Sequence, residues 1–592
     1  MSKKVSVGVS KKASNRSSQT TTTAWRYYVV LGIVVLIYAG LLARSAYIQI
    51  IEPEMLKKQG DMRSMRVAAN TVQRGSIIDR NGDELAISVP VETVWADPKI
   101  IMDNNALTMS EHWQALADVL GQDVNKLTTR VVRHPTKRFV YLERKISPAM
   151  ANYIRELKIP GIHLRKESKR FYPTGEISAH IVGFTNVDDK GIEGVERVYD
   201  QLLTGKGGSK RFRKDAKGRK VEILSVEAAQ EAKNIRLTID QRIQAIAYKE
   251  VKGAVQAFKA TSGSVVVADI HTGEILAMAN SPSYNPNNRR NTAIHRFRNR
   301  AITDIYEPGS TMKPLTALTA LEFGSAKLNT VIDTSPGWMR LGGRRVNDPI
   351  NRGKLSIEDI LVTSSNMGTT KLALSVPKNF LLDKFFDAGF ADNTGSGLVG
   401  ESSGMMHDRA RWSKFELATL SWGYGLAITP MQLARFYATL ANGGIKRELS
   451  IVKADQPSEG ERVFSKVNST AVMTMLETVV DEHVQKAKVA GYRVGGKTGT
   501  SFKAVAGGYG NDYVGLFAGV APISNPQVVV VVVINDPGGD LYHGGEVAAP
   551  VFSRVMKGAL RVLNVVPDAN EKLALRKTNN ESRVNVLEAN DV

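Results

Sequence analysis

The stretch "QVVVVVVIND", Gln527–Asp536, contains an uninterrupted apolar run from Val528 to Ile534. Valine and isoleucine favour extended backbone, so the run predicts a β-strand. A strand that lacks alternating polar residues has no face for water and must be covered on both sides. The run therefore predicts an inner strand of a sheet on which helices pack.

Four further strands surround this one in the predicted domain. The segments "YRVGGKTGTSF" and "YVGLFAGVAP" directly precede it, and "SGSVVVADIHTGEILAMANS" predicts a hairpin around His271–Gly273. Helices are predicted in between, at residues 310–323, 356–375, 412–420 and 430–442. This order predicts an α/β fold of the α+β type, with an antiparallel sheet built from both ends of the domain.

Residues 51–235 are predicted to form a separate pedestal or interaction module. "RGSIIDRNGDELAIS" predicts two short strands around an Asn81-Gly82 turn, and helices are predicted near 111–131 and 147–157. No catalytic constellation occurs there. The pattern changes near Arg236, where we place the boundary of the second domain, which runs to 565 and precedes a polar tail, 566–592, that we expect to be disordered.

The N-terminus predicts a membrane anchor. Residues 1–26 contain six basic residues and no acid, and "YYVVLGIVVLIYAGLLA" then gives 17 uncharged residues before Arg44. We expect a transmembrane helix over 27–47, a cytoplasmic tail over 1–26 and export of the remainder. The alternative is a cleaved signal peptide, which is disfavoured because the apolar run exceeds a usual signal core and an arginine lies in the candidate cleavage site.

Composition limits the other functions. The formal charge is +21, but the basic residues are spread along the chain, so we expect no nucleic-acid partner. A basic exterior suits lipid headgroups or an acidic polymer. The absence of cysteine excludes disulfides and thiol catalysis. We expect neither a metal nor a cofactor.

"YEPGSTMKPLT", Tyr306–Thr316, places Ser310 and Lys313 three residues apart behind a Pro-Gly turn. By itself this pattern is usually the start of a surface helix. In a helix, however, positions i and i+3 share a face, so a neutral lysine could take the serine proton if burial or a cation lowers its pKa. Pro314 lacks an N–H, so the first turn is expected to be irregular.

Two later motifs complete a set. "TSSNMG" supplies Ser364 and Asn366, and "GGKTGTS" supplies a second lysine followed by Thr-Gly-Thr. Each motif alone has a structural explanation, as a helix start or an edge strand. In this order, however, they match the motif set of serine enzymes that penicillin acylates. Candidate site residues are therefore Ser310, Lys313, Ser364, Asn366, Lys497, Thr498, Gly499 and Thr500.

Each residue has an expected role. Ser364 can relay a proton from the Lys313 side to a leaving amine, and Asn366 can bind a substrate amide. Lys497 offers a cation for a carboxylate, which Thr498 and Thr500 can hydrogen-bond. Gly499 is expected to leave room for substrate backbone, and the N–H groups of Ser310 and Thr500 to face one oxyanion. The predicted substrate is a peptide that ends in a free carboxylate.

The sequence resembles the class B penicillin-binding proteins, and among them the division transpeptidases of gammaproteobacteria. The matching segments are "RGSIIDR", "FYPTGEISAHIVGFTNVDDKGIEGVE", "MANSPSYNPNN", "EPGSTMKP", "SSN", "WGYGLAITPMQLAR" and "KTGT". The resemblance extends from the anchor to about residue 565. Trp422 stands where the family has phenylalanine, which is a change of packing.

The resemblance implies a fold and an activity. The fold is the penicilloyl-serine transferase fold, a five-stranded antiparallel sheet flanked by helices over 236–565, behind a dimerisation-type pedestal over 51–235. The activity is D,D-transpeptidation, in which Ser310 attacks the penultimate D-alanine carbonyl of a stem pentapeptide. A neighbouring stem's amine then resolves the ester into a cross-link, and β-lactams imitate the D-Ala-D-Ala end.

The resemblance also implies a place and partners. It puts the protein in the inner membrane as a single-pass protein, with a periplasmic catalytic domain at the division septum. The implied partners are FtsW, the FtsQ-FtsL-FtsB complex and FtsN. An elongation-specific class B enzyme remains an alternative, as does a non-enzymatic penicillin sensor or scaffold. A class A β-lactamase is disfavoured, because residues 367–496 contain no Glu-x-x-x-Asn.

Overall fold

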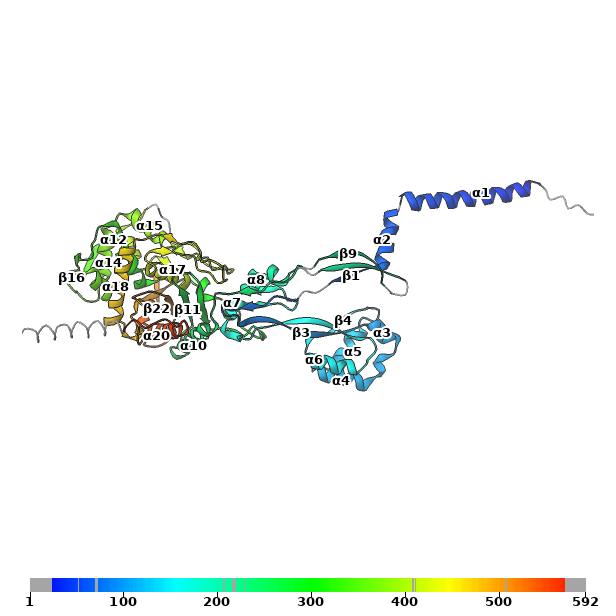
Figure 1. Cartoon of the computed structure of the whole chain (residues 1–592), viewed down its shortest axis with the longest axis horizontal. Coiled ribbons are helices and arrows are strands. Elements are labelled where there is room, and N and C mark those ends of the chain that lie inside the picture. The colour runs from blue at the N-terminus through cyan, green and yellow to red at the C-terminus, as the bar shows by residue number, and fades with distance from the viewer. Residues whose placement is uncertain are drawn as a thin grey trace, which may run out of the picture. The chain divides into compact units, whose positions relative to one another are not determined.

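The computed structural model describes residues 24–51, 53–69, 73–205, 208–215, 220–228, 230–406, 409, 411–505 and 508–569. The chain forms two compact units. The smaller comprises Met1–Thr71 and Gly207–Gln230, and the larger comprises Val72–Lys206 and Glu231–Val592. The predicted 51–235 module is therefore divided between the two units, each of which is coloured by residue number in Figure 1.

The smaller unit carries the predicted anchor. Helix α1, Ala24–Ala46, continues into a π-helical turn, and the span Ala24–Ile50 is long and apolar enough to cross a membrane, with none of it buried. The predicted tail falls largely on residues 1–23, outside the described residues. The remaining elements are helix α2 (Pro53–Ser64) and a three-stranded sheet, β1 (Met65–Ala69), β8 (Ser209–Lys214) and β9 (Lys220–Glu227).

Residues 73–205 of the larger unit, here called the inner pedestal, are built around a long strand. Strand β3 (Glu84–Ala96) pairs with β2 (Ile77–Ile78), β4 (Val140–Ile146) and β5 (Ile162–Phe171). The predicted Asn81-Gly82 turn joins β2 to β3 and is confirmed, with Gly82 at φ 101°.

The predicted helical stretch 111–131 is two helices, α4 (Ser110–Leu120) and α5 (Val124–Val132). Gly121 ends the first in a left-handed conformation, and the Asp123 carboxylate caps the second by accepting a hydrogen bond from Lys126 N. The other predicted helix is α6, Pro148–Glu156.

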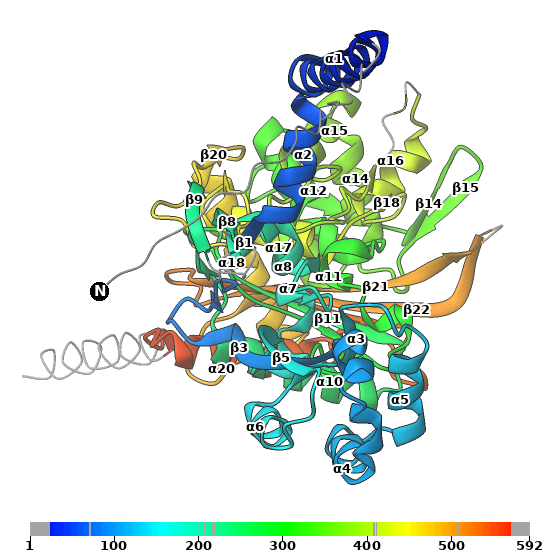
Figure 2. The ribbon, with the colours of Figure 1, turned by 90° about the vertical axis from the view of Figure 1, so that its right-hand side faces the viewer.

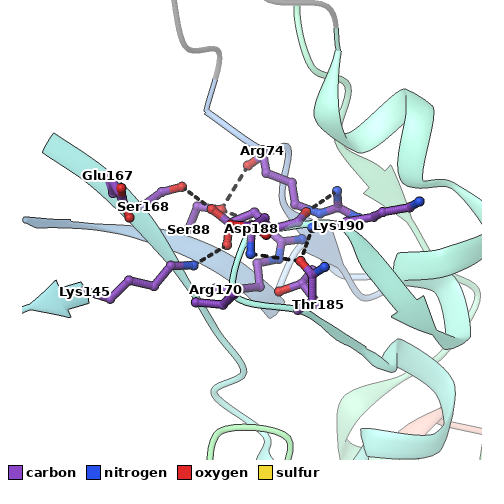
Figure 3. A network of polar contacts seen from close by, with 12 residues as sticks. Arg74, Ser88, Lys145, Glu167, Ser168, Arg170, Thr185, Asp188 and Lys190 are labelled. Carbon is purple, nitrogen blue, oxygen red and sulfur yellow. Dashed lines mark hydrogen bonds and ion pairs between the residues drawn. The ribbon is translucent and has the colours of Figure 1, made fainter. Parts of the chain in front are cut away.

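A buried ion-pair network fastens the inner pedestal. Glu196, in helix α8 (Gly194–Val198), has no exposed surface and accepts Nε–H donors from Arg74 at 2.7 Å and Arg170 at 2.6 Å. Arg74 also donates to Asp200 at 2.7 Å, in helix α9 (Asp200–Thr204). Figure 3 shows Arg74 and Arg170 within this network, beside Ser88. Arginines far apart in sequence are thus joined by one carboxylate.

The sheet of the second domain is five-stranded and antiparallel, as predicted. Its order is β12-β11-β23-β22-β21. The strands are β11 (Ser262–Asp269), β12 (Ile275–Ser281), β21 (Gly495–Val505), β22 (Gly508–Ala521) and β23 (Val528–Asn535). All residues of the run Val528–Ile534 are buried, which confirms that this inner strand is covered on both faces.

Two groups of helices cover the sheet (Figures 1 and 2). Helices α10 (Gln241–Ala257) and α20 (Ala549–Val562) pack on one another and on the sheet, as do α17 (Pro430–Ala441) and α18 (Lys466–Glu482). The packed chain continues past 565, because the buried carboxylate of Asp568 accepts hydrogen bonds from Arg493 N and Ser524 N. Residues 570–592 of the expected tail lie outside the described residues.

Candidate active site

The candidate nucleophile lies in an irregular turn, as predicted. Ser310 is part of a 3-10 helix, Gly309–Met312, which leads into helix α12, Lys313–Phe323. Pro314 stands at the start of α12, where its missing N–H costs no helical hydrogen bond. Gly309 has φ 55°, a conformation that favours glycine. The turn therefore holds Ser310 one turn before a buried lysine.

Lys313 joins the first two motifs. It is 1% exposed, and its Nζ donates hydrogen bonds to Ser364 Oγ at 3.1 Å, to Asn366 Oδ1 at 2.8 Å and to the Ser364 carbonyl. These contacts bring together residues that are more than fifty positions apart in the sequence. They also place an amine against the hydroxyl that was predicted to relay a proton.

The predicted helix 356–375 is wrong, because it is interrupted at the second motif. Helix α13 (Ile357–Val362) ends before the motif, α14 (Asn366–Leu374) begins after a break, and Ser364 between them has φ 56°. A serine in the left-handed region is strained and needs surrounding contacts to hold it. The N-cap of α14 is Ser365, whose Oγ accepts a hydrogen bond from Gly368 N at 2.9 Å.

Asp348 holds this break in place and was not predicted from the sequence. Its carboxylate is 9% exposed and accepts hydrogen bonds from Asn366 N at 2.6 Å, Met367 N at 3.0 Å and the Ser365 hydroxyl. A carboxylate at a helix N-terminus satisfies free N–H groups and complements the helix dipole. Asp348 lies 18 residues before Asn366 and outside the predicted helix, so its contact with the helix start could not be recognised from local spacing.

The third motif lies on edge strand β21, against the nucleophile turn. A Cβ added to Gly499 would lie 2.5 Å from the Pro308 carbonyl oxygen and 3.0 Å from Thr311 Cγ2. The turn therefore packs against the side of Gly499 where a Cβ would lie, and the expected room for substrate backbone along the strand stays a prediction. Thr500 Oγ1 accepts a hydrogen bond from Gly544 N at 3.0 Å and keeps its own proton to donate. Lys497 is 2% exposed.

The two lysines differ in their electrostatics. Burial, reinforced by the charge of Lys497, holds the pKa of Lys313 well below its ordinary value, against a smaller opposite effect of Asp348. Burial lowers the pKa of Lys497 to about 8. Of the two amines, Lys313 is therefore the one that gives up its proton more readily, which is the order that the predicted roles of base and carboxylate-binding cation require.

A cavity of about 530 Å³ adjoins the turn on its N-terminal side. Glu307 lines it, and its Oε1 accepts hydrogen bonds from Gly425 N at 2.8 Å and the Tyr509 hydroxyl at 3.2 Å. Burial raises the pKa of this carboxyl, and its buried Oε2 has no hydrogen-bond partner among the described residues. Glu307 was not among the residues predicted from the sequence, although it lies three residues before Ser310.

Comparison with known proteins gives two family matches. Residues 263–557 match the penicillin binding protein transpeptidase domain, and residues 69–237 match the penicillin-binding protein dimerisation domain. Peptidoglycan D,D-transpeptidase FtsI of Escherichia coli K12 is 47% identical over 561 residues, which cover 94% of this chain and 95% of that protein. The FtsI of Buchnera aphidicola from Schizaphis graminum is 41% identical, with 92% and 96% covered.

Solved structures agree in fold. A peptidoglycan synthetase from Bifidobacterium adolescentis superimposes with a TM-score of 0.69 at 24% identity, covering 85% of this chain and 98% of that one. The transpeptidase domain of penicillin-binding protein 3 from Burkholderia pseudomallei gives a TM-score of 0.52 at 38% identity, covering 56% of this chain and 97% of that one. The first likeness concerns the fold alone.

Proposed function

The chain belongs to the class B penicillin-binding proteins and is a peptidoglycan D,D-transpeptidase, and we propose that it works at the division septum through an ester on Ser310. The observation that carries the site assignment is the position of Lys313 Nζ. This buried amine contacts both functional side chains of the Ser364–Asn366 loop and lies one helical turn after the serine. Few structural lysines are buried without an acid.

The proposed acylation begins with proton transfer from Ser310 Oγ to the neutral Lys313 amine. The serine oxygen then bonds to the penultimate D-alanine carbonyl carbon, and the N–H groups of Ser310 and Thr500 stabilise the oxyanion. Collapse breaks the peptide bond, and the proton reaches the leaving amine through Ser364. The terminal D-alanine departs, and an ester remains on Ser310.

Substrate binding and the second step use the remaining residues. Lys497, with Thr498 and Thr500, holds the terminal carboxylate of the donor stem, and Asn366 binds a stem amide. The amine of a neighbouring stem then attacks the ester, loses a proton towards Lys313 and releases Ser310 as a hydroxyl. The product is a new amide that cross-links two strands.

The setting of the enzyme is proposed from the anchor and from the relatives. Helix α1 would anchor the chain in the cytoplasmic membrane with both globular parts on the periplasmic side. The names of the FtsI relatives support a division role. Residues 51–235, together with the anchor, are proposed to bind FtsW, the FtsQ-FtsL-FtsB complex and FtsN, whereas residues 236–565 carry the chemistry.

Labelling with a fluorescent penicillin tests the nucleophile. One covalent adduct is expected, and peptide mapping should place it on Ser310. The Ser310→Ala variant should take up no label, whereas the control Ser413→Ala, which changes the exposed cap of another helix, should label normally. A label on a different serine, or labelling that persists in Ser310→Ala, would contradict the assignment.

Depletion in the native organism tests the septal role. Cells that lose the protein should grow into smooth filaments, because side-wall synthesis continues while septation stops. Ser310→Ala should reach mid-cell and fail to restore division. Rounded cells, with the protein spread along the side wall, would instead indicate the elongation enzyme. Restored division by Ser310→Ala would indicate a sensor or scaffold.

A further inference from the structure

A short hairpin extends the Asn366 side of the candidate active site. Strands β14 (Trp338–Leu341) and β15 (Arg344–Asn347) pair antiparallel through a two-residue Gly342-Gly343 turn, in which both glycines have positive φ. Figure 2 shows the hairpin at the edge of the domain, near α14 and α16 (Lys414–Ser421). Strand β15 runs directly into Asp348, the residue that holds the second motif.

The two faces of the hairpin differ sharply. Residues paired directly across an antiparallel ladder share a face. Met339 pairs with Val346, and this face packs with Met367 and Ala418 in a small apolar cluster. The outer face instead carries the pairs Trp338–Asn347 and Arg340–Arg345, and all four residues are exposed, with Trp338 at 41%.

Positive charge gathers on and beside the hairpin, and the outer face itself carries Arg340 and Arg345. Residues 338–354 contain five exposed cations, none of which forms an ion pair with a residue that the structure describes. The one acid in this segment is Asp348, which is buried and already bonded to the helix α14 terminus. Two of the five, Arg340 and Arg345, lie on the outer face. Arg344 shares the inner face with Leu341 and lies 5.1 Å from the centre of the Phe415 ring. Arg352 and Lys354 follow the hairpin, and Lys354 is paired across a second ladder with Asp333.

The paired arginines of the outer face destabilise the hairpin when no ligand is bound. Arg340 and Arg345 stand directly opposite one another, and like charges in such a pair destabilise a hairpin. The Arg345 guanidinium lies 4.9 Å from the centre of the Trp338 ring, which orients its planar group while leaving its N–H donors free. A ligand with carboxylates would relieve the repulsion and accept hydrogen bonds from both guanidinium groups.

We propose that the outer face of the β14–β15 hairpin binds the carboxylate-bearing peptide of the acceptor strand of peptidoglycan. This inference rests on the proposed function, because that reaction needs a second stem beside the one that Ser310 attacks. The carboxylate of the donor stem is assigned to Lys497 on β21. The hairpin instead adjoins the Ser364–Asn366 motif, because Asn366 Nδ2 donates a hydrogen bond to the Asn347 carbonyl at 3.5 Å. The hairpin therefore offers separate cations for a separate peptide.

Binding to purified peptidoglycan sacculi tests the proposal. The full-length protein in detergent is first acylated with penicillin, so that the donor site is blocked, and is then co-sedimented with sacculi. Arg340→Glu/Arg345→Glu should bind at least about tenfold more weakly at low salt. The difference should shrink as ionic strength rises, because the contacts are exposed. Sacculi whose carboxylates have been amidated should bind the unsubstituted protein as weakly as unmodified sacculi bind the variant.

A matched control variant distinguishes an effect of the hairpin cations from an effect of the net charge of the protein. Lys249→Glu/Lys557→Glu makes the same change in net charge on exposed positions of α10 and α20 and should bind sacculi normally. Equal losses in the two double variants would overturn the proposal, as would undiminished binding of the hairpin variant or retained binding to amidated sacculi.

The acylation rate separates this proposal from the proposed function. The hairpin variant should react with penicillin at the rate of the unsubstituted protein, within about twofold, which also shows that it is folded. Slow acylation of the variant would mean that the hairpin acts through the Asn366 loop, and would overturn the binding proposal. A Ser310 that takes no label in the unsubstituted protein would instead refute the proposed function itself.

Discussion

The inner pedestal and the candidate active site bury positive charge in opposite ways. In the inner pedestal, Arg74 and Arg170 share the fully buried carboxylate of Glu196. At the candidate active site, Lys313 and Lys497 are at most 2% exposed, and neither forms an ion pair with a residue that the structure describes. The charge of Lys497 instead adds to the lowering of the pKa of Lys313.

The difference separates a structural role from a reactive one. A buried cation that is paired keeps its proton and fixes the segments that carry it. A buried lysine without an acid partner loses its proton more readily than an exposed one, because burial penalises its charged form. Arginine occupies the paired sites and lysine the unpaired ones, as expected from the much higher pKa of arginine. The following substitutions test this contrast.

The largest effect is expected for Lys313→Arg. Arginine does not deprotonate, so Ser310 would lose its general base, and the acylation rate should fall by about 10²–10⁴-fold. The rate is measured by stopped-flow or quenched labelling with penicillin. Lys327→Arg, at an exposed position after α12, is the control and should react normally. Acylation at an undiminished rate in Lys313→Arg would show that another group takes the serine proton.

Glu196→Gln tests the paired site. Removal of the carboxylate leaves the buried Arg170 guanidinium without its ion-pair partner and leaves Arg74 with Asp200 alone. Loss of one partner of a buried pair typically destabilises by about 3–5 kcal/mol. The midpoint temperature of thermal unfolding should therefore fall strongly, while the protein that remains folded should still be acylated at the normal rate. Glu92→Gln removes an acid whose partner Arg155 is exposed, with 54% of the Arg155 side chain and 15% of the Glu92 side chain open to water, and should cost about 0–1 kcal/mol. Similar shifts in both variants would break the comparison.

The sequence allowed the sheet and the three motifs to be predicted because both are local patterns. The apolar run Val528–Ile534 and the Ser310–Lys313 spacing each depend on neighbouring residues only. The break at Ser364 could not be predicted, because a helical pattern crosses it and the opposing contacts come from Lys313 and Asp348. The true neighbours of Gly499 were missed for the same reason, since they lie on another element.

The pH dependence of acylation should sharpen the contrast between the two lysines. The rate should rise as pH increases through the lowered pKa of Lys313, because only the neutral amine accepts the serine proton. It should fall again above about pH 8, where Lys497 loses the charge that holds the carboxylate of penicillin. Lys497→Arg should react more slowly, because the guanidinium has a different shape, but should lose the high-pH decrease.

The decisive measurement is the second-order acylation rate constant from pH 5 to 10, which reports groups of the free enzyme. A high-pH decrease that survives in Lys497→Arg would assign it to another group. Loss of all acylation in that variant, together with acylation retained in Lys313→Arg, would reverse the two roles.

The smallest effect is expected for Asp348→Asn, which keeps an acceptor oxygen for the N–H groups of Asn366 and Met367 but removes the negative charge. The loss of about one good hydrogen bond should slow acylation by about tenfold at most. The carboxylate of Asp348 raises the pKa of Lys313, so its removal should lower that pKa further. The rising limb of the pH profile should consequently move to lower pH. A purely structural residue would slow the reaction without moving this limb, and a shift to higher pH would contradict the assigned electrostatics.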